Sequence, residues 1–271
     1  MNIAHALESL LAHGAVAIAH PHRQTLSVRG ADSARWLQAL ITADVLAMRE
    51  GAQCYALLLE KKGRIVSDLY LQKRANGYDV SIHSSVFAQV VETFDRHVIM
   101  EDVELQTTEL GVLVEEFISG TSAYPHGSAQ AAFSWVPEPR HNAVDAESAL
   151  GRGLRAVLRA PAFAQEFDAR DYPQEAGIES PTVSMSKGCY LGQEVVCMIQ
   201  MRGSISRKLR AVLSPDGQIS GDLHRDSVAA GAMRSLGQWN GTNLGFAMLK
   251  RTFGEPGVSL HDAAGHPCTV L

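Results

Sequence analysis

The spacing of apolar residues predicts short strands and a helix in the first 45 residues. Residues 2–13 have helical spacing, and β-prone runs follow at 15–19 and 25–28. A second helix is expected after Gly30, with an apolar stripe of Trp36, Leu37, Leu40 and Ile41. The opening segment is therefore interpreted as helix, two strands and helix.

The next sixty residues continue this alternation. Apolar runs at 54–59 and 65–71 predict a hairpin, and Asn76-Gly77 is a strong two-residue turn signal before a strand at 78–82. A helix is expected over 86–98, and a further strand follows it. This order predicts a split β-α-β (ferredoxin-like) body, which is an open sheet with helices on one face.

Towards the C-terminus, the sequence predicts mainly short strands separated by turns. Residues 119–130 are expected to be a surface loop, strands are expected at 133–136 and 154–158, and a short helix at 161–167. From Arg207 onward, β-prone pieces alternate with Pro/Gly/Asn turns, which predicts a small β-barrel. The predicted class is α+β, with an α+β body over 1–204 and a C-terminal β-barrel domain over 205–271.

Composition narrows the class of protein. The 271 residues are 46% hydrophobic and 20% charged, which is typical of a globular chain and excludes extended disorder as the dominant state. A net charge of −5 argues against a protein whose main task is direct binding of nucleic acid. Because no apolar run reaches the roughly 20 residues that span a bilayer, no membrane association is expected. The prediction is a soluble cytoplasmic protein.

The cysteines and histidines do not predict a metal site. The four cysteines, Cys54, Cys189, Cys197 and Cys268, include no C-x-x-C pair, so reduced thiols are expected. His20 and His22 form the only close histidine pair, and no cluster of acids or thiols accompanies them in the sequence.

The densest group of reactive residue types lies at Lys187-Gly188-Cys189-Tyr190-Leu191-Gly192-Gln193-Glu194. Glycine permits positive φ or a close approach of backbone to a ligand, so this composition suits a tight loop that delivers several functional groups to one place. An ordinary loop before a helix is the alternative interpretation.

Three shorter motifs accompany this segment in order along the chain. They are Gly30-Ala31-Asp32 with Thr42-Ala43-Asp44, then Lys62-Gly63-Arg64 with Asp68, and then Glu175-Ala176-Gly177-Ile178. Together with K-G-C-Y-x-G-Q-E and the Arg202-Gly203 that follows it, they resemble the YgfZ family of folate-binding proteins, relatives of the glycine-cleavage T-protein, an aminomethyltransferase. The resemblance covers most of the chain from about residue 28.

This resemblance implies a fold of the aminomethyltransferase folate-binding type and a bound tetrahydrofolate or one-carbon derivative. It also implies a role in iron–sulfur cluster assembly or repair and, through iron–sulfur enzymes, in tRNA modification, with those enzymes or assembly proteins as clients. The candidate folate-binding residues lie in and just after the signature segment, residues 187–194, which includes Gly188, Gly192 and Gln193. Glu194 is the first choice of acceptor for the pteridine donors, and Tyr190 either stacks on a ring of the folate or packs in the core. Lys187 and Arg202 either bind the glutamate carboxylates or are solvated surface charges.

Cys189 is the residue with the most specific predicted chemistry. A thiol beside Lys187, in a glycine loop that precedes a helix, is expected to have reactive thiolate character. The other three cysteines are expected to pack as small hydrophobic residues. One departure from the family pattern is Met198, which stands where an arginine is usual.

Two other functions remain open from the sequence. A folate-dependent aminomethyl or one-carbon transferase would use Asp68 to orient the reacting nitrogen, although Ser67 replaces the first acid of the D-D pair in the T-proteins. A protein-interaction module without any ligand is the third possibility. A monomer is expected, because the chain shows no heptad seam.

Overall fold

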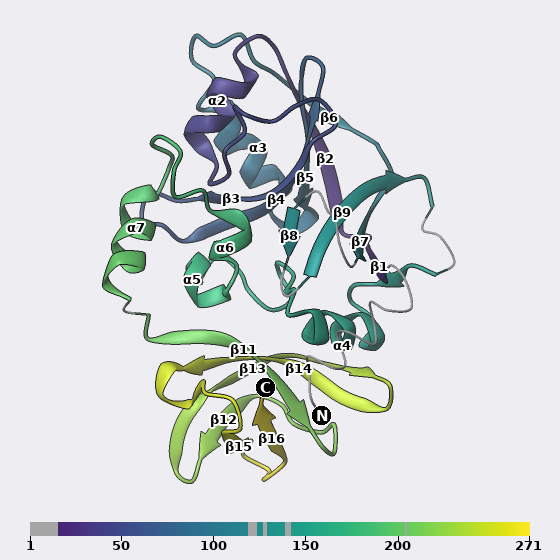
Figure 1. Cartoon of the computed structure of the whole chain (residues 1–271), viewed down its shortest axis with the longest axis vertical. Coiled ribbons are helices and arrows are strands. Elements are labelled where there is room, and N and C mark those ends of the chain that lie inside the picture. Colours follow the sequence, from purple (N-terminus) through teal and green to yellow (C-terminus); the bar gives the residue numbers. More distant parts are fainter. Residues whose placement is uncertain (1–15, 119–123, 127–128, 139–141, 204) are drawn as a thin grey trace.

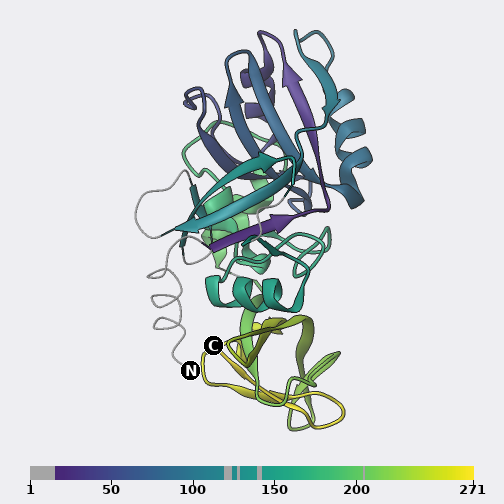
Figure 2. The ribbon, with the colours of Figure 1, turned by 90° about the vertical axis from the view of Figure 1, so that its right-hand side faces the viewer.

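The computed structural model describes residues 16–118, 124–126, 129–138, 142–203 and 205–271. The helix expected over residues 2–13 lies outside these residues. Two β-sheets and a β-barrel are stacked along the long axis of the molecule (Figures 1 and 2). The predicted α+β class with a C-terminal β-barrel is confirmed. The division into 1–204 and 205–271 stays a prediction.

The first sheet is antiparallel and has the strand order β3-β4-β5-β2-β6. Its strands are β2 (Arg23–Arg29), β3 (Gln53–Leu59), β4 (Ile65–Arg74), β5 (Gly77–His83) and β6 (Glu104–Thr108). The helices α2 (Ser33–Leu40) and α3 (Phe87–Asp95) share one apolar cluster with this sheet, to which they contribute Leu37, Leu40, Val90 and Phe94. One face of the sheet is therefore packed under helices, as the sequence predicts, whereas consecutive buried residues along β3, β4 and β5 show that the other face is covered as well.

The second sheet has the order β10-β1-β7-β9-β8. Its strands are β1 (Val16–His20), β7 (Val112–Ile118), β8 (Tyr124–His126), β9 (Ala129–Val136) and β10 (Val144–Asp145). The predicted loop at 119–130 is thus wrong at β8 and at the start of β9, and its residues 119–123 and 127–128 lie outside the described ranges. Tyr55 and Tyr70 of the first sheet lie in the same core cluster as Ile18 and Phe117 of the second, so the two sheets pack together.

The predicted strand at 154–158 is wrong, because these residues end the helix α4 (Ala149–Leu158). Ser148 caps α4 by accepting a hydrogen bond from the Gly151 N–H. A Cβ at Gly153 would lie 2.6 Å from the backbone of Gln238 in the barrel, so the glycine lets helix and barrel touch. The helix expected at 161–167 is also wrong, since these residues form turns.

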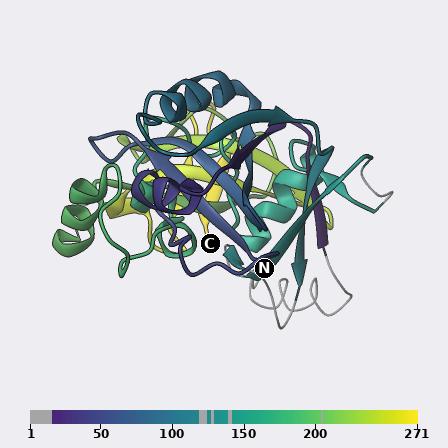
Figure 3. The same cartoon turned by 90° about the horizontal axis from the view of Figure 1, so that it is seen from above.

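Three helices follow α4, namely α5 (Pro173–Ala176), α6 (Glu179–Thr182) and α7 (Gln193–Arg202). The single turns η1 (Ser84–Val86) and η2 (Arg251–Phe253) are 3₁₀ helices. Figure 3 shows α7 at the edge of the molecule. None of the helices in the described ranges is long and apolar enough to cross a membrane.

The C-terminal strands close into a barrel of order β11-β14-β13-β12-β15-β16. They are β11 (Arg207–Ser214), β12 (Asp222–Arg225), β13 (Val228–Trp239), β14 (Thr242–Lys250), β15 (Ser259–His261) and β16 (Pro267–Val270). Leu209 and Phe246 of the barrel share a core cluster with Leu154 and Val157 of α4. The helix α4 therefore lies between the upper sheets and the barrel (Figure 1).

Candidate functional site

The signature segment crosses the C-terminal end of α2. The Thr42 hydroxyl donates a hydrogen bond of 2.6 Å to the Thr182 carbonyl, and the Ser184 N–H donates to the Thr42 carbonyl at 3.0 Å. Further along, the Leu191 N–H donates to the Ala39 carbonyl at 3.2 Å. The signature segment and the residues just before it are thus held by hydrogen bonds to α2 and to Thr42, which are far away in the sequence.

Lys187 is buried beneath this segment. Its ammonium donates to the carbonyls of Ile41 at 2.7 Å and Ala43 at 2.8 Å, just past the last turn of α2. A cation at a helix C-terminus is favourable, because the carbonyls there carry partial negative charge. Burial lowers the pKa of Lys187 to about 8. Two of its three N–H donors are therefore used within the fold, and its proposed contact with folate carboxylates stays a prediction.

The lowered pKa of Lys187 predicts a pH-dependent stability. Because the folded-state pKa of about 8 lies below the ordinary lysine value of 10.5, the unfolded chain binds more protons than the folded chain between these two pH values. The free energy of unfolding, relative to that of Lys187→Met, should rise from pH 7.5 to pH 10. Urea unfolding of both proteins at the two pH values measures this difference. If the free energy of unfolding of the wild type, relative to Lys187→Met, falls between pH 7.5 and pH 10, the lowered pKa of Lys187 is contradicted.

The end of the signature segment packs on the β3–β4 hairpin. Gly192 has a φ of +82°, and a Cβ there would lie 2.6 Å from the Glu60 carbonyl oxygen. Gly63, in the hairpin turn, has a φ of +76°, and its Cβ would lie 2.9 Å from that of Val195. Both positions require glycine, because backbone and side chain approach so closely. A Cβ at Gly188, in contrast, would meet open space.

Cys189 is the exposed thiol of the four, all of which lie in the described residues. Cys54 and Cys197 are half-buried, and Cys268 is buried. Burial raises the pKa of Cys54 to about 12 and that of Cys268 to about 11, so both are almost fully protonated near neutral pH. The structure therefore singles out Cys189 as the thiol that a partner can reach.

The other predicted ligand residues do not converge. Tyr190 is 6% exposed and belongs to a core cluster with Leu57 and Phe163, so its ring packs inside the fold. Glu194 is exposed in the first turn of α7, and Arg202 is exposed in the last. Eight residues of helix separate the two by roughly 12 Å along the axis. Gln193, half-buried, is the first residue of α7.

Asp68 lies apart from the signature segment, on the sheet face opposite α2 and α3. It is 1% exposed, and Arg23 Nη1 donates to both of its carboxylate oxygens, at 3.0 and 3.2 Å. Tyr55 donates its hydroxyl to the same carboxylate at 3.1 Å. The carboxylate is thus enclosed by a cation and a phenol.

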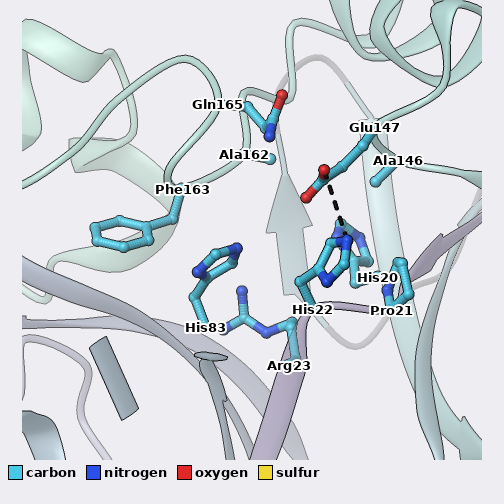
Figure 4. A pocket seen from close by; sticks show the side chains of 10 residues that line it. All are labelled: His20, Pro21, His22, Arg23, His83, Ala146, Glu147, Ala162, Phe163 and Gln165. Atoms are coloured by element: carbon cyan, nitrogen blue, oxygen red, sulfur yellow. Dashed lines mark ion pairs between the residues drawn. The ribbon is translucent and has the colours of Figure 1, made fainter. Parts of the chain in front are cut away.

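Next to this ion pair, a small pocket opens between β1, β2 and the turns that follow α4 (Figure 4). His22 and Glu147 form an ion pair of 3.7 Å across it, and His83 and Gln165 also line it. Burial lowers the pKa of His20, whose ring contacts Glu115 at 3.3 Å. Within the described ranges, no group of three His, Cys, Asp or Glu residues is placed to hold a metal ion.

A second cavity, of about 330 Å³, lies among α5, α6 and α7. Its polar side chains come from Gln174, Glu179, Ser180 and Gln200, and its apolar ones from Val183, Met185 and Val196. Gln174 and Glu179 each have a buried oxygen without a hydrogen-bond partner in the described part of the chain. Neither residue is among those predicted from the sequence, since no spacing pattern reveals an unpaired buried acceptor.

Comparisons with known proteins find the following similarities. Residues 11–114 match the family model of the GCVT N-terminal domain. An aminomethyltransferase of Rubrobacter xylanophilus is 30% identical over 111 residues, which cover 36% of this chain and 30% of that protein. A tRNA-modifying protein YgfZ of Yersinia enterocolitica is 25% identical over 219 residues, covering 68% of this chain and 66% of that protein.

Two further similarities extend over more of the chain. The mitochondrial iron–sulfur cluster assembly factor IBA57 homolog of Pyricularia oryzae is 20% identical over 289 residues, covering 88% of this chain and 74% of that protein. The crystal structure of the glycine cleavage system aminomethyltransferase T from Bartonella henselae superimposes with a TM-score of 0.76 at 12% identity, covering 94% and 84% of the two chains. The resemblance predicted from the motifs is confirmed.

Proposed function

We propose that this relative of the YgfZ proteins binds tetrahydrofolate and supports iron–sulfur cluster assembly or repair and, through iron–sulfur enzymes, tRNA modification. The observation that carries the proposal is the exposure of Cys189 on a segment that is fixed to the rest of the fold. Hydrogen bonds to α2 hold one side of the segment, and Gly192 holds the other against the β3–β4 hairpin. The thiol is therefore presented at a defined position.

A thiolate is both a nucleophile and a ligand for iron, so one exposed thiol suits a protein that meets a cluster or a cluster enzyme. The proposed clients are such enzymes or assembly proteins. The net charge of −5 does not favour direct binding to tRNA. We place the protein in the cytoplasm as a monomer.

The fit of a folate to this chain rests on hydrogen-bond acceptors. A pteridine presents an amino group and a ring N–H side by side, and these donors need acceptors that are not already paired. Glu194, exposed in the first turn of α7, carries a carboxylate of this kind. The residues present therefore fit the group.

The transferase alternative is less well supported. It requires Asp68 to orient a reacting nitrogen, but the Asp68 carboxylate already accepts hydrogen bonds from Arg23 and Tyr55. Ser67, the neighbour that replaces an acid of the T-proteins, is itself buried and donates to the Asp68 carbonyl at 2.8 Å. The acid proposed for that chemistry is held as part of the core.

Calorimetry tests the folate part of the proposal. Titrating tetrahydrofolate into the purified protein should release or absorb heat that saturates at one ligand per chain. The p-aminobenzoyl-glutamate fragment, which lacks the pteridine, should bind much more weakly, because the donor edge is missing. The absence of any heat with tetrahydrofolate at high micromolar concentration contradicts folate binding.

A further inference from the structure

A cavity of about 240 Å³ lies where the barrel strand β11 meets the ends of α4 and α5 (Figure 1). Three cationic side chains line it, those of Arg159, Lys208 and Arg210. No acidic side chain among the described residues lines the cavity with them. This gathering of positive charge contrasts with the net charge of −5 of the whole chain. The cavity therefore attracts anions.

Arg159 is in an unusual backbone conformation. It ends α4 with a φ of +55°, in the left-handed region where glycine is the common residue. Its N–H donates to the Ala156 carbonyl at 3.4 Å. The Ala160 N–H donates to the Arg155 carbonyl at 3.0 Å, so backbone groups already cap the helix. The Arg159 side chain is exposed and has no hydrogen bond or ion pair among the described residues. Its guanidinium is therefore free to bind a ligand.

Lys208 and Arg210 are two residues apart on β11, so they lie on the same face of the strand, roughly 7 Å from each other. Arg210 Nε donates to the Gly254 carbonyl at 2.7 Å, and its two Nη groups have no partner in the described ranges. Lys208 Nζ lies 3.4 Å from Glu179 Oε1. Three cations and this one acid leave an excess of two positive charges.

The charge and the walls of the cavity decide which anion fits. A phosphate monoester carries between about 1.5 and 2 negative charges at pH 7 and offers three strong acceptor oxygens. Guanidinium groups donate to phosphate oxygens in pairs, which makes arginine well suited to this group. Pro161, Ala176 and Phe246 provide apolar surface for an organic part. Because the volume is below the usual lower limit of roughly 300 Å³ for small-molecule sites, the ester must be small.

We propose that this cavity binds the phosphate group of a small phosphate monoester. Arg159 and Arg210 donate hydrogen bonds to the phosphate oxygens, and Lys208 adds its charge. The organic part of the ester lies against Pro161 and Phe246. The site shares no residue with the proposed folate and thiol function, so either can be wrong without the other.

The test is calorimetry of the full chain with glycerol 3-phosphate, inorganic phosphate and succinate. Glycerol 3-phosphate should bind more tightly than inorganic phosphate, because only the ester contacts the apolar walls. Succinate should bind at least about tenfold more weakly, because its two charges lie at opposite ends of the molecule. Arg159→Gly and Arg210→Gln should each weaken binding of glycerol 3-phosphate at least about tenfold, since each removes charged donors.

Two controls separate the site from general effects. Arg49→Gln removes an exposed arginine outside the cavity, so it changes the net charge equally and should leave binding unchanged. Arg159→Gly places the favoured residue at a left-handed position, so its melting temperature should equal or exceed that of the wild type. A loss of binding in this variant is then not a loss of folding.

Each outcome supports or overturns the proposal. Weakened binding in both cavity variants, with Arg49→Gln unaffected, supports the site. It is overturned if glycerol 3-phosphate gives no saturable heat at millimolar concentration, if the cavity variants bind like the wild type, or if Arg49→Gln weakens binding equally. Inorganic phosphate binding as tightly as glycerol 3-phosphate would overturn the assignment to an ester, and succinate binding as tightly would overturn the assignment to phosphate.

Discussion

Replacing Arg23 by methionine is expected to lower the free energy of unfolding by about 3–5 kcal/mol. The Arg23 side chain is 5% exposed and donates to both Asp68 carboxylate oxygens, as well as to the hydroxyl and carbonyl oxygens of Ser81. Its removal leaves the Asp68 carboxylate, which is 1% exposed, as a buried charge without its cation. Urea denaturation at pH 7 measures the loss.

The double variant Arg23→Met with Asp68→Leu is the matched control. Replacing both members of a buried pair by apolar residues removes the unpaired charge, so much of the lost stability should return. A loss below about 1 kcal/mol in Arg23→Met would contradict the enclosed pair, since that is the usual range of exposed ion pairs. The result also bears on function, because an Asp68 fixed in this way is not available to a transferase.

Alkylation of the folded protein is expected to be much faster at Cys189 than at Cys54 and Cys268. With pKa values of about 12 and 11, Cys54 and Cys268 have fewer than roughly one thiolate in a thousand molecules at pH 7.5. Cys189 is exposed, so iodoacetamide reaches it directly. Peptide mass spectrometry over a time course gives the rate at each cysteine.

The variant Cys189→Ser is the control for this experiment. It should take up label slowly, and unfolding in urea should then expose the remaining thiols to rapid labelling. Labelling of Cys54 or Cys268 in the native protein as fast as that of Cys189 would contradict the burial of these two thiols and the exposure of Cys189.

The sequence predicts the first sheet well because its signals are local. β2 and β5 alternate apolar and polar residues, β3 is a continuous apolar run, and Asn76-Gly77 marks the turn between β4 and β5. The same kind of reasoning fails at 154–158, where Leu154, Val157 and Leu158 resemble a strand. The Ser148 cap and the contact of Gly153 with the barrel favour a helix there. The contact of Gly153 is made with Gln238, which is far away in the sequence.

The candidate site is predictable only in part for the same reason. The motifs identify the segment that carries Cys189, and the helix expected after it is α7. They do not show that Lys187 turns inward to the end of α2, because its partners Ile41 and Ala43 are more than 140 residues away. Nor do they show that Tyr190 packs in the core.

The most direct test of the account uses cells that lack this protein and depend on it for a tRNA modification made by an iron–sulfur enzyme. They would express the wild-type chain, Cys189→Ser or Cys197→Ser at matched protein levels, and the modified fraction of the tRNA would be measured. The account predicts full restoration by wild type and Cys197→Ser and almost none by Cys189→Ser. Restoration by Cys189→Ser to the wild-type level would contradict it.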